Sequence, residues 1–459
     1  MAKYQKYAEY KDSGVEWLGE IPRHWDSKPL KYLCTYNDEV LPETTAKDAE
    51  IQYIDIGSVS AVDGISKIET MIFKDAPSRA RRIVRDGDVI VSTVRTYLEA
   101  IAPINNPPEN LIVSTGFAVI RPNQYLYKSF ASYCLRAKGF IKEVVARSVG
   151  VSYPAINSSD LVNITIPSIG YVEQVKIANF LDHETAKIDS LIAKQEKLIE
   201  LVKEKRQAVI SHAVTKGLNP DVAMKDSGVE WLGQVPEHWV VSFIKYILAK
   251  AKDAMVDGPF GSSVNTATDY VEDGIPVIRT VNITNQGFSS ENLKFMRISK
   301  FEELKRHSVK TGDVLFSKVG TIGNACIFPE NMGVGILSTT GSCKISINED
   351  LIDRDFLVFQ IHCMNQELTQ IANANVQPFL NMTNIKNLRI SLPSLDEQKS
   401  IISLLKSKLD SFDRLIAKAE SAIQLMQERR TALISAAVTG KIDVRNWQHP
   451  NEAKKGLSS

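Results

Sequence analysis

The sequence has no run of about 18 apolar residues, so it predicts no membrane-spanning helix. Its first residues, MAKYQKYAEYKDSG, have neither the apolar core nor the cleavage site of a secretory signal. Hydrophobic residues make up 44% and charged residues 24% of the chain, which is typical of a soluble globular protein. We therefore expect a cytoplasmic protein with no membrane partner.

Cysteine is sparse, and its spacing excludes two kinds of site. The five cysteines among 459 residues are scattered, and no C-x-x-C spacing occurs. An odd, dispersed set argues against a disulfide framework and against a zinc site. We expect reduced, structural thiols and no metal.

Catalytic and nucleotide-binding motifs are absent as well. No G-x-x-x-x-G-K-[ST] loop is present to cradle a nucleoside triphosphate. The NPPE segment (106–109) has Glu109 where an amino-methyltransferase motif has an aromatic ring that stacks on a flipped base, so we interpret it as a turn. DGPFGSS (257–263) has the wrong glycine spacing for a dinucleotide fingerprint and predicts a tight loop near DNA or another strand. The chain is predicted to be no enzyme, with no catalytic residues and no cofactor of its own.

What the chain does have is an internal repeat. KDSGVEWLGEIPRHW (11–25) returns as KDSGVEWLGQVPEHW (225–239), with twelve of fifteen positions identical. Residues 173–215 align without a gap on 397–439, with twenty of 43 positions identical. The protein is therefore a tandem duplication of a unit about half its length.

Between the repeated phrases the halves differ in sequence but keep a skeleton. GDVIVSTVR (87–95) matches GDVLFSKVG (312–320), and VSTGFAVIRP (113–122) matches LSTTGSCKISI (337–347). Gly-Asp turns before β-branched runs predict strands. Both variable regions are predicted to be β-rich with helical additions.

The repeated segment 173–215 predicts one long helix with an apolar stripe at coiled-coil spacing. The predicted seam residues are Leu181, Ile188, Leu191, Leu198, Val202 and Val209 in the first copy, and Leu405, Phe412, Leu415, Met426 and Leu433 in the second. The simplest partner for each stripe is its duplicate, lying antiparallel across a pseudo-two-fold axis. The alternative is that each stripe packs on its own neighbouring domain.

A paired rod of about 41 residues would be roughly 60 Å long. We expect it to hold the two variable domains apart by at most about 18 base pairs of DNA.

Basic residues are concentrated in the first half, although the net charge is only +1. Between positions 74 and 147 there are twelve Lys/Arg and six Asp/Glu, whereas positions 240–390 hold fifteen of each. The first excess favours a phosphate-facing surface. The alternative is a solvated face whose counter-charges come from elsewhere in the chain.

This arrangement resembles the specificity subunits of type I restriction-modification enzymes, over nearly the whole chain. The doubled KDSGVEWLG phrase, the helix entries IPSIGYVEQ (166–174) and LPSLDEQ (392–398), the DGPFGSS stretch and the LIAK motifs (191–194 and 415–418) carry the resemblance. It implies an α+β fold with two similar β-rich target-recognition domains, separated by two long antiparallel helices that form a coiled coil with pseudo-two-fold symmetry. The implied boundaries are 1–170 and 218–394 for the two domains with their repeated entry segments, 171–217 and 395–440 for the helices, and 441–459 for a C-terminal tail.

The resemblance also implies partners. Each domain would read one half of a bipartite site in double-stranded DNA, and the repeats would hold two methyltransferase subunits that carry S-adenosylmethionine. Motor-nuclease subunits with ATP and Mg would complete a restriction complex. An alternative is an internally symmetric coiled-coil scaffold that binds proteins; a steep loss of DNA affinity with salt would distinguish the reader from the scaffold.

Base edges and phosphates are contacted by side chains with fixed forks or hydroxyls. The predicted DNA-binding residues are Arg79, Arg81, Arg82, Arg95, Tyr97 and Arg121 in the first half, and Ser262, Ser263, Arg279, Asn282, Lys318, Thr321 and Gln377 in the second. The duplicated Trp17, Trp25, Trp231 and Trp239 are candidates for the partner surface. The alternative is that these tryptophans pin the repeated phrase on its own domain.

Overall fold

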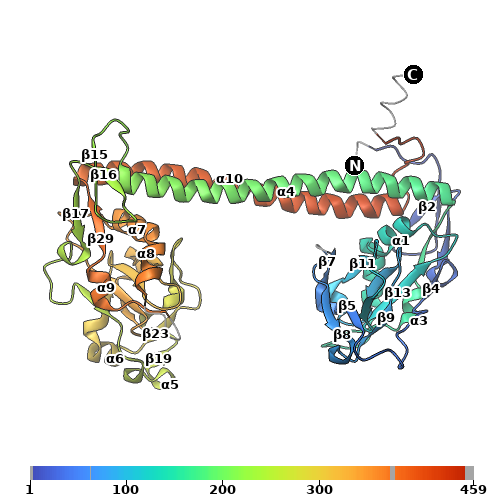
Figure 1. Ribbon diagram of the computed structural model, residues 1–459, viewed down its shortest axis with the longest axis horizontal. Helices are drawn as coiled ribbons and strands as arrows, with labels where there is room; N and C mark the ends of the chain where they lie inside the picture. The colour runs from blue at the N-terminus through green and yellow to red at the C-terminus, as the bar shows by residue number, and fades with distance from the viewer. Residues whose placement is uncertain (1–3, 62–63, 373–377, 450–459) are drawn as a thin grey trace. The chain divides into compact units, whose positions relative to one another are not determined.

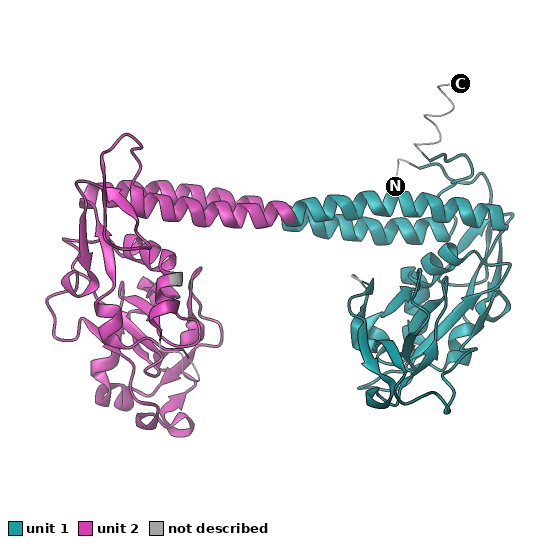
Figure 2. Cartoon of the chain, in the orientation of Figure 1, with its two compact units in different colours: residues 1–196, 420–459 teal, residues 197–419 magenta. Residues whose placement is uncertain are grey.

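The structure, a computed structural model, describes residues 4–61, 64–372 and 378–449 (Figure 1). The chain folds as two compact units: residues 1–196 with 420–459 form unit 1, and residues 197–419 form unit 2 (Figure 2). Each of the two long helices therefore gives one segment to each unit. In the described part of the chain no helix has both the length and the apolar character that a bilayer crossing requires.

Unit 1 contains two four-stranded sheets, with strand orders β11-β10-β13-β4 and β8-β5-β12-β9, and three shorter pairings, β1-β2, β3-β14 and β6-β7. Its strands are β1 (Tyr10–Asp12), β2 (Glu20–Pro22), β3 (Asp26–Pro29), β4 (Cys34–Tyr36), β5 (Glu50–Ile54), β6 (Val59–Ser60), β7 (Gly64–Ile65), β8 (Glu69–Ile72), β9 (Ala80–Ile83), β10 (Val89–Ser92), β11 (Ile101–Pro103), β12 (Leu111–Ser114), β13 (Phe117–Pro122) and β14 (Thr165–Ser168). Its short helices are α1 (Lys128–Leu135), α2 (Lys138–Ala146) and α3 (Ser158–Val162). Only β5 and β12 pair in parallel in the two larger sheets.

Unit 2 repeats this plan, with sheets β18-β28-β25-β26 and β19-β23-β20-β27-β24 and the pairs β15-β16, β17-β29 and β21-β22. Its strands are β15 (Met224–Asp226), β16 (Gln234–Pro236), β17 (Val240–Phe243), β18 (Met255–Asp257), β19 (Tyr270–Val271), β20 (Ile275–Ile278), β21 (Ile283–Thr284), β22 (Gly287–Phe288), β23 (Lys294–Met296), β24 (Ser308–Lys310), β25 (Val314–Ser317), β26 (Ala325–Ile327), β27 (Val334–Leu337), β28 (Ser342–Ile345) and β29 (Arg389–Leu392). Its short helices are α5 (Thr266–Asp269), α6 (Ile298–Glu303), α7 (Arg354–Cys363), α8 (Asn365–Ile371) and α9 (Met382–Lys386).

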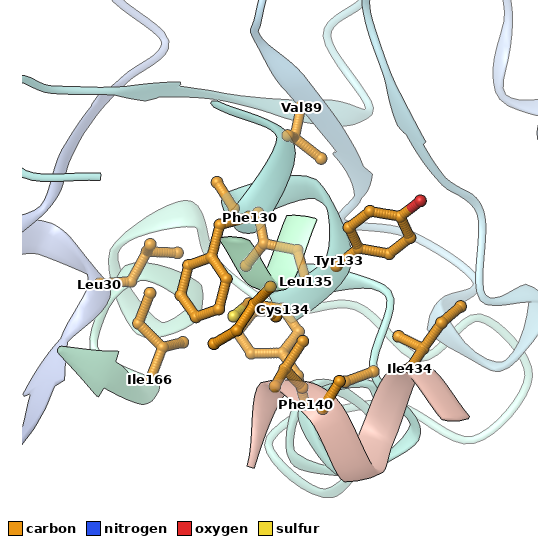
Figure 3. Close-up of a cluster of buried hydrophobic side chains, with 14 of the residues drawn as sticks. Leu30, Val89, Phe130, Tyr133, Cys134, Leu135, Phe140, Ile166 and Ile434 are labelled. Atoms are coloured by element: carbon orange, nitrogen blue, oxygen red, sulfur yellow. The ribbon is translucent and has the colours of Figure 1, made fainter. Parts of the chain in front are cut away.

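The two Gly-Asp turns lead into buried strands, as the sequence predicts. Gly87 and Gly312 have φ of +88° and +83° before β10 and β25. Val89 of β10 faces the helix-covered core that also holds Phe130 (Figure 3), whereas its neighbour Ile90 faces the core shared by the two sheets. Because both faces of β10 are buried, its sequence is a continuous apolar run rather than an alternation. The central strand of each unit thus separates two layers of core.

The long helices are α4 (Tyr171–Lys216) and α10 (Leu395–Val438), of 46 and 44 residues. In each unit a segment of α4 lies side by side with a segment of α10 (Figure 2). In unit 1 Ile188 shares a core with Leu433, and in unit 2 Ile210 shares one with Leu405. Residues late in one helix therefore meet residues early in the other, which confirms the predicted antiparallel pairing.

The seam has a different second row from the one predicted. The rows at Leu181, Ile188 and Val202, and at Leu405 and Leu433, are buried as expected. The second row of seam residues stands four residues after the first row, not three as predicted. Leu409, four after Leu405, is buried, and Ile192, four after Ile188, packs against the core. The predicted Leu191 and Leu415 are instead 49% and 39% exposed. Of the other predicted seam residues, Val209, Phe412 and Met426 pack against the cores, and Leu198 is half-buried.

An arginine occupies the second row of each helix. Arg430 of α10 pairs with Asp189 of α4 at 2.9 Å in unit 1, and Arg206 of α4 pairs with Asp413 of α10 in unit 2. The two pairs occupy equivalent positions in the repeat, because each acid and each arginine is 224 residues from its counterpart. A charged group in an apolar seam disfavours other registers, since sliding the helices would leave it unpaired.

The seam assignment predicts unequal losses of stability for two adjacent substitutions in α4. Ile192→Ala should lower the free energy of unfolding of unit 1 by about 1–2 kcal/mol, because it removes partly buried methylenes. Leu191→Ala should change it by less than about 0.5 kcal/mol, because that side chain is on the surface. Urea unfolding of the full chain, followed by circular dichroism, measures both; a larger loss for Leu191→Ala would contradict the four-residue spacing.

Candidate nucleic-acid interface and repeat-anchoring site

Much of the predicted basic surface of unit 1 is neutralised within the unit. Arg121 donates from Nε and Nη2 to the two carboxylate oxygens of Asp88 at 2.9 and 2.8 Å, and from Nη1 to Glu39 at 2.9 Å. These bonds raise the pKa of Arg121. Arg85 shares Glu39, and Lys128 pairs with Asp86. The Arg121 guanidinium is therefore held by carboxylates of its own unit, and its contact with DNA stays a prediction. Glu39 is 82 residues away in sequence, so the local charge count missed it.

The three arginines at and beside β9 have separate environments. Arg79 is exposed. The guanidinium carbon of Arg81 lies 4.9 Å from the ring centroid of Phe73, and burial lowers the pKa of the half-buried Arg82. Arg79 thus presents its charge at the surface, whereas Arg81 and Arg82 are both half-buried.

Arg95 and Tyr97 lie on one exposed turn between β10 and β11. The structure packs this turn against residues 148–155, which sequence reasoning missed. Thr96 Oγ1 is 2.7 Å from Ser148 Oγ, and the guanidinium carbon of Arg95 is 4.9 Å from the ring centroid of Tyr153. The signal for this second loop was present in RSVGVSYP (147–154), where two valines flank Gly150 and a proline follows, in a segment that cannot be a core strand.

The predicted residues of unit 2 divide into exposed and buried sets. Ser262 and Thr321 are exposed, and Ser263 is half-exposed. Asn282 is fully buried and bonds the 289–291 backbone through Nδ2, while Lys318 is 5% exposed and donates to Asp257 at 2.9 Å.

The DNA-binding predictions for Asn282 and Lys318 are therefore corrected, since both side chains are committed to internal partners. Arg279 donates to the carbonyl oxygen of Asn292 at 2.5 Å and stays partly exposed. Gln377 lies outside the described residues.

Two other motifs take the conformations expected of them. The NPPE segment is a loop between β11 and β12. In DGPFGSS, a Cβ on Gly258 would lie 2.1 Å from the carbonyl oxygen of Thr339, so this glycine allows two backbone segments to approach closely.

The four tryptophans of the repeated phrase are not equivalent. Trp25 and Trp239 are fully buried, so their assignment to a partner surface is corrected. Trp17 is half-buried, donates to the carbonyl oxygen of Thr165 at 3.0 Å and lines an open groove of about 980 Å³ with α2 and the end of α10. Trp231 is also half-buried.

The buried tryptophans anchor the long helices. Trp25 Nε1 donates to Glu173 in the first turn of α4 at 3.1 Å, and Trp239 Nε1 donates to Glu397 in the first turn of α10 at 3.0 Å. The histidine before each tryptophan bonds to the same carboxylate at 3.0 Å. A carboxylate is also favoured at a helix N-terminus by the helix dipole. The doubled phrase and the doubled helix entry are thus two halves of one repeated contact.

The next residue of each helix completes this contact. Gln174 accepts from the backbone N–H of Tyr127 and donates to the carbonyl oxygens of Tyr125 and Ile169. Gln398 makes the same three kinds of bond, to the N–H of Asp353 and the carbonyl oxygens of Leu351 and Pro393. The Glu-Gln dipeptide therefore ties each helix to both the repeated phrase and the loop before α1 or α7.

The cysteines have the structural character expected. Cys34, Cys134, Cys326 and Cys343 are buried. Burial raises the pKa of the Cys34, Cys326, Cys343 and Cys363 thiols to about 12. Within the described residues no group of three or more His, Cys, Asp or Glu side chains could hold a metal ion.

Two units with one buried skeleton and different exposed loops, each anchored to long helices, define a protein with two separate recognition surfaces. The chain belongs to the family described as type I restriction modification DNA specificity domain, whose model matches residues 22–201 and 238–425. It is a type I restriction-modification specificity subunit with two target-recognition domains, a non-catalytic class of protein. The predicted family and fold class are confirmed.

Relatives and solved structures are similar over most of the chain. A putative type I restriction enzyme MjaX specificity subunit from Methanocaldococcus jannaschii is 24% identical over 93% of this chain and 96% of its own length. The StySPI specificity subunit from Salmonella potsdam is 23% identical over 94% and 92%. The HsdS subunit from Thermoanaerobacter tengcongensis has the same fold, with a TM-score of 0.53, 21% identity and coverage of 92% and 98%. A chain from a type I R-M system complex has a TM-score of 0.72, 20% identity and coverage of 92% and 99%.

The shared carboxylate predicts a marked loss of stability when it is removed. Glu173→Ala should lower the free energy of unfolding by about 3 kcal/mol, because Trp25, His24 and Tyr7 all lose their acceptor. Glu173→Gln should lose less, since it keeps one acceptor oxygen. Urea unfolding followed by tryptophan fluorescence measures both. An Ala variant as stable as the parent would show that the helix entry is anchored by packing alone.

Proposed function

We propose that this chain reads a bipartite site in double-stranded DNA, with each unit reading one half, and that its repeats hold two methyltransferase subunits. The observation that carries the proposal is one fold, present twice, in a family of DNA specificity domains. The buried strands are equivalent in the two units, whereas the exposed turns carry different residues. Two different surfaces on one scaffold suit a site with two different halves.

The exposed turns supply suitable chemistry for DNA contact. In unit 1 Arg79, Arg95 and Tyr97 are exposed. An arginine fork suits base edges or phosphates, and an aromatic ring suits stacking. In unit 2 Ser262 and Thr321 offer hydroxyls for phosphates. Because unit 2 has no local excess of positive charge, we propose that its half-site contact depends more on the charge of partner subunits.

A repeated apolar surface supports the proposed pair of identical partners. Leu191 and Leu425 in unit 1 are 49% and 62% exposed, and Leu201 and Leu415 in unit 2 are 48% and 39% exposed. Leu191 is equivalent to Leu415 in the repeat, and Leu201 to Leu425. Each unit therefore carries one leucine from each equivalent set, one on α4 and the other on α10.

The helix register brings each pair together. In unit 1 the Asp189–Arg430 pair sets α4 against α10, so Leu425 lies opposite position 194, about one turn from Leu191. In unit 2 the Arg206–Asp413 pair sets Leu415 opposite position 204, near Leu201. Exposed leucines that recur in pairs are suited to a helical partner surface. We propose that each pair contacts one methyltransferase subunit.

Cofactors then belong to the partners in this proposal. S-adenosylmethionine would be bound by the methyltransferase subunits, and ATP and Mg by motor-nuclease subunits where a restriction complex forms. DNA is the substrate of that assembly in the cytoplasm. The chain itself would supply sequence recognition and position the catalytic subunits on the two half-sites.

The proposal predicts a specific loss of methylation in the native host. Deleting this gene should abolish adenine methylation at one split motif, made of two specified halves and a fixed unspecified gap, and restoring the gene should return it. Sequencing that detects modified bases measures this across the genome. Unchanged methylation in a host that expresses the gene would contradict the DNA-reading function and favour a protein-binding scaffold.

If each leucine pair binds one methyltransferase subunit, removing one pair should halve the number of methyltransferase subunits bound per chain. The double variant Leu191→Asp with Leu425→Asp should bind one methyltransferase subunit instead of two, because each charge desolvates poorly in an apolar contact. The variant Leu201→Asp with Leu415→Asp should lose the other copy. Native mass spectrometry of the purified complex measures the stoichiometry.

A matched control for these variants is Ala193→Asp. This residue is also exposed and lies about 160° around α4 from Leu191, since each residue turns the helix by about 100°. It should leave two subunits bound. Two bound subunits in both leucine variants would place the partner contact elsewhere.

A further inference from the structure

Arg95 has a backbone conformation that its residue type disfavours. Its φ and ψ are +50° and +49°, in the left-handed region. The equivalent residue of unit 2 is Gly320, with φ of +75°. A left-handed conformation costs a residue with a side chain about 1–2 kcal/mol more than glycine. Unit 2 therefore has glycine, the residue that adopts this conformation most easily, whereas unit 1 has an arginine there.

The surrounding structure holds the turn in place. Thr93 Oγ1 donates to the carbonyl oxygen of Gly116 at 2.8 Å, and Ser92 Oγ donates to that of Val94 at 2.7 Å. Thr96 is 3% exposed, and its hydroxyl is 2.7 Å from Ser148 Oγ. Val94 also forms an isolated β-bridge with Ala155. The turn and the 148–155 loop are therefore one fixed structure.

That loop carries the ring on which Arg95 stacks. Tyr153 is 66% exposed, and its ring centroid is 4.9 Å from the Arg95 guanidinium carbon. Among the described residues no acidic side chain forms an ion pair with Arg95, and this includes Glu99 on the same turn. Arg85, Arg121 and Arg147, in contrast, all pair with carboxylates.

Stacking fixes the plane of a guanidinium while leaving its N–H edge able to donate. A fixed planar fork matches the O6 and N7 acceptors of guanine in the major groove, which is the commonest specific arginine contact with DNA. A phosphate can be bound from many directions and would not need a strained, stacked arginine. The geometry therefore favours a base edge over the DNA backbone.

We propose that Arg95 donates both arms of its guanidinium to a guanine in the half-site read by unit 1, and that Tyr153 is the positioning residue for this contact. The inference rests on the proposed DNA-reading function. It adds that one position of the first half-site is a G·C pair, and that unit 2 lacks this reader because Gly320 occupies the equivalent turn.

The experiment uses the full chain in complex with its methyltransferase subunits and follows methylation of duplexes that carry the split motif. Each guanine of the first half-site, on either strand, is replaced in turn by 7-deazaguanine, which lacks the N7 acceptor but keeps Watson–Crick pairing. For the parent protein, one replacement should lower kcat/KM by about 10-fold or more. For Arg95→Ala the same replacement should have almost no further effect.

Substitutions separate base reading from backbone strain. Arg95→Gly should raise the melting temperature, because it relieves the left-handed strain. Although more stable, this variant should accept all four base pairs at the position that Arg95 reads. Arg95→Lys should also lose discrimination, because it has no fork. Tyr153→Ala should relax the same position, whereas Tyr153→Phe, which keeps the ring, should retain most of the specificity.

Arg85→Ala is the matched control, since Arg85 is an exposed arginine of the same unit that pairs with Glu39. It should leave the motif unchanged. An unchanged motif for Arg95→Ala, or an equal loss at every sequence as expected of a phosphate contact, would overturn the inference. Absence of any split motif with the parent protein would instead overturn the proposed function.

Discussion

Each long helix is tied to its own unit by a Glu-Gln dipeptide in its first turn, and the carboxylate of that dipeptide joins the helix to the repeated phrase. Glu173 and Glu397 accept from a buried tryptophan and from the histidine before it. The start of each helix and the repeated phrase are therefore held in one contact. Because an unpaired buried indole N–H is costly, each phrase and its helix entry must be kept together in both halves.

This contact changes the meaning of the duplicated phrase. From sequence, an identical phrase in both halves favours two copies of one partner. The structure gives the phrase an internal role, since Trp25 and Trp239 are fully buried against their own units. In the proposed function, another repeated feature, the exposed leucines of α4 and α10, takes the role of contacting two identical partners. The buried tryptophans give the phrase a role inside each unit, whereas the exposed leucines have no such internal role and are suited to a partner surface.

The sequence predicts the larger features of the fold and misses those that depend on distant residues. The repeat, the two long helices and the strands after the Gly-Asp turns follow from local patterns. The second seam row does not, because apolar residues stand at both the three- and four-residue spacings, and only the facing helix decides between Leu191 and Ile192. Arg121 looked free because its partner Glu39 is far away in sequence. The loop containing Tyr153 was missed because its contact with Arg95 is tertiary.

The same reasoning explains how the two domains can differ in recognition without differing in fold. Asp88 and Asp313 cap equivalent turns by accepting from the N–H groups of Arg85 and Lys310. These hydrogen bonds fix the start of β10 and of β25, and so the place where the turn after each strand leaves the sheet. In the turn after each strand, Arg95 and Gly320 are both exposed and both have a positive φ, so the residue there can differ between the units without changing the core. The exposed turns can therefore change while the anchoring carboxylates and the helix register stay constant. Under the proposed function, this lets the DNA sequence that is read change while the proposed partner surfaces stay in place.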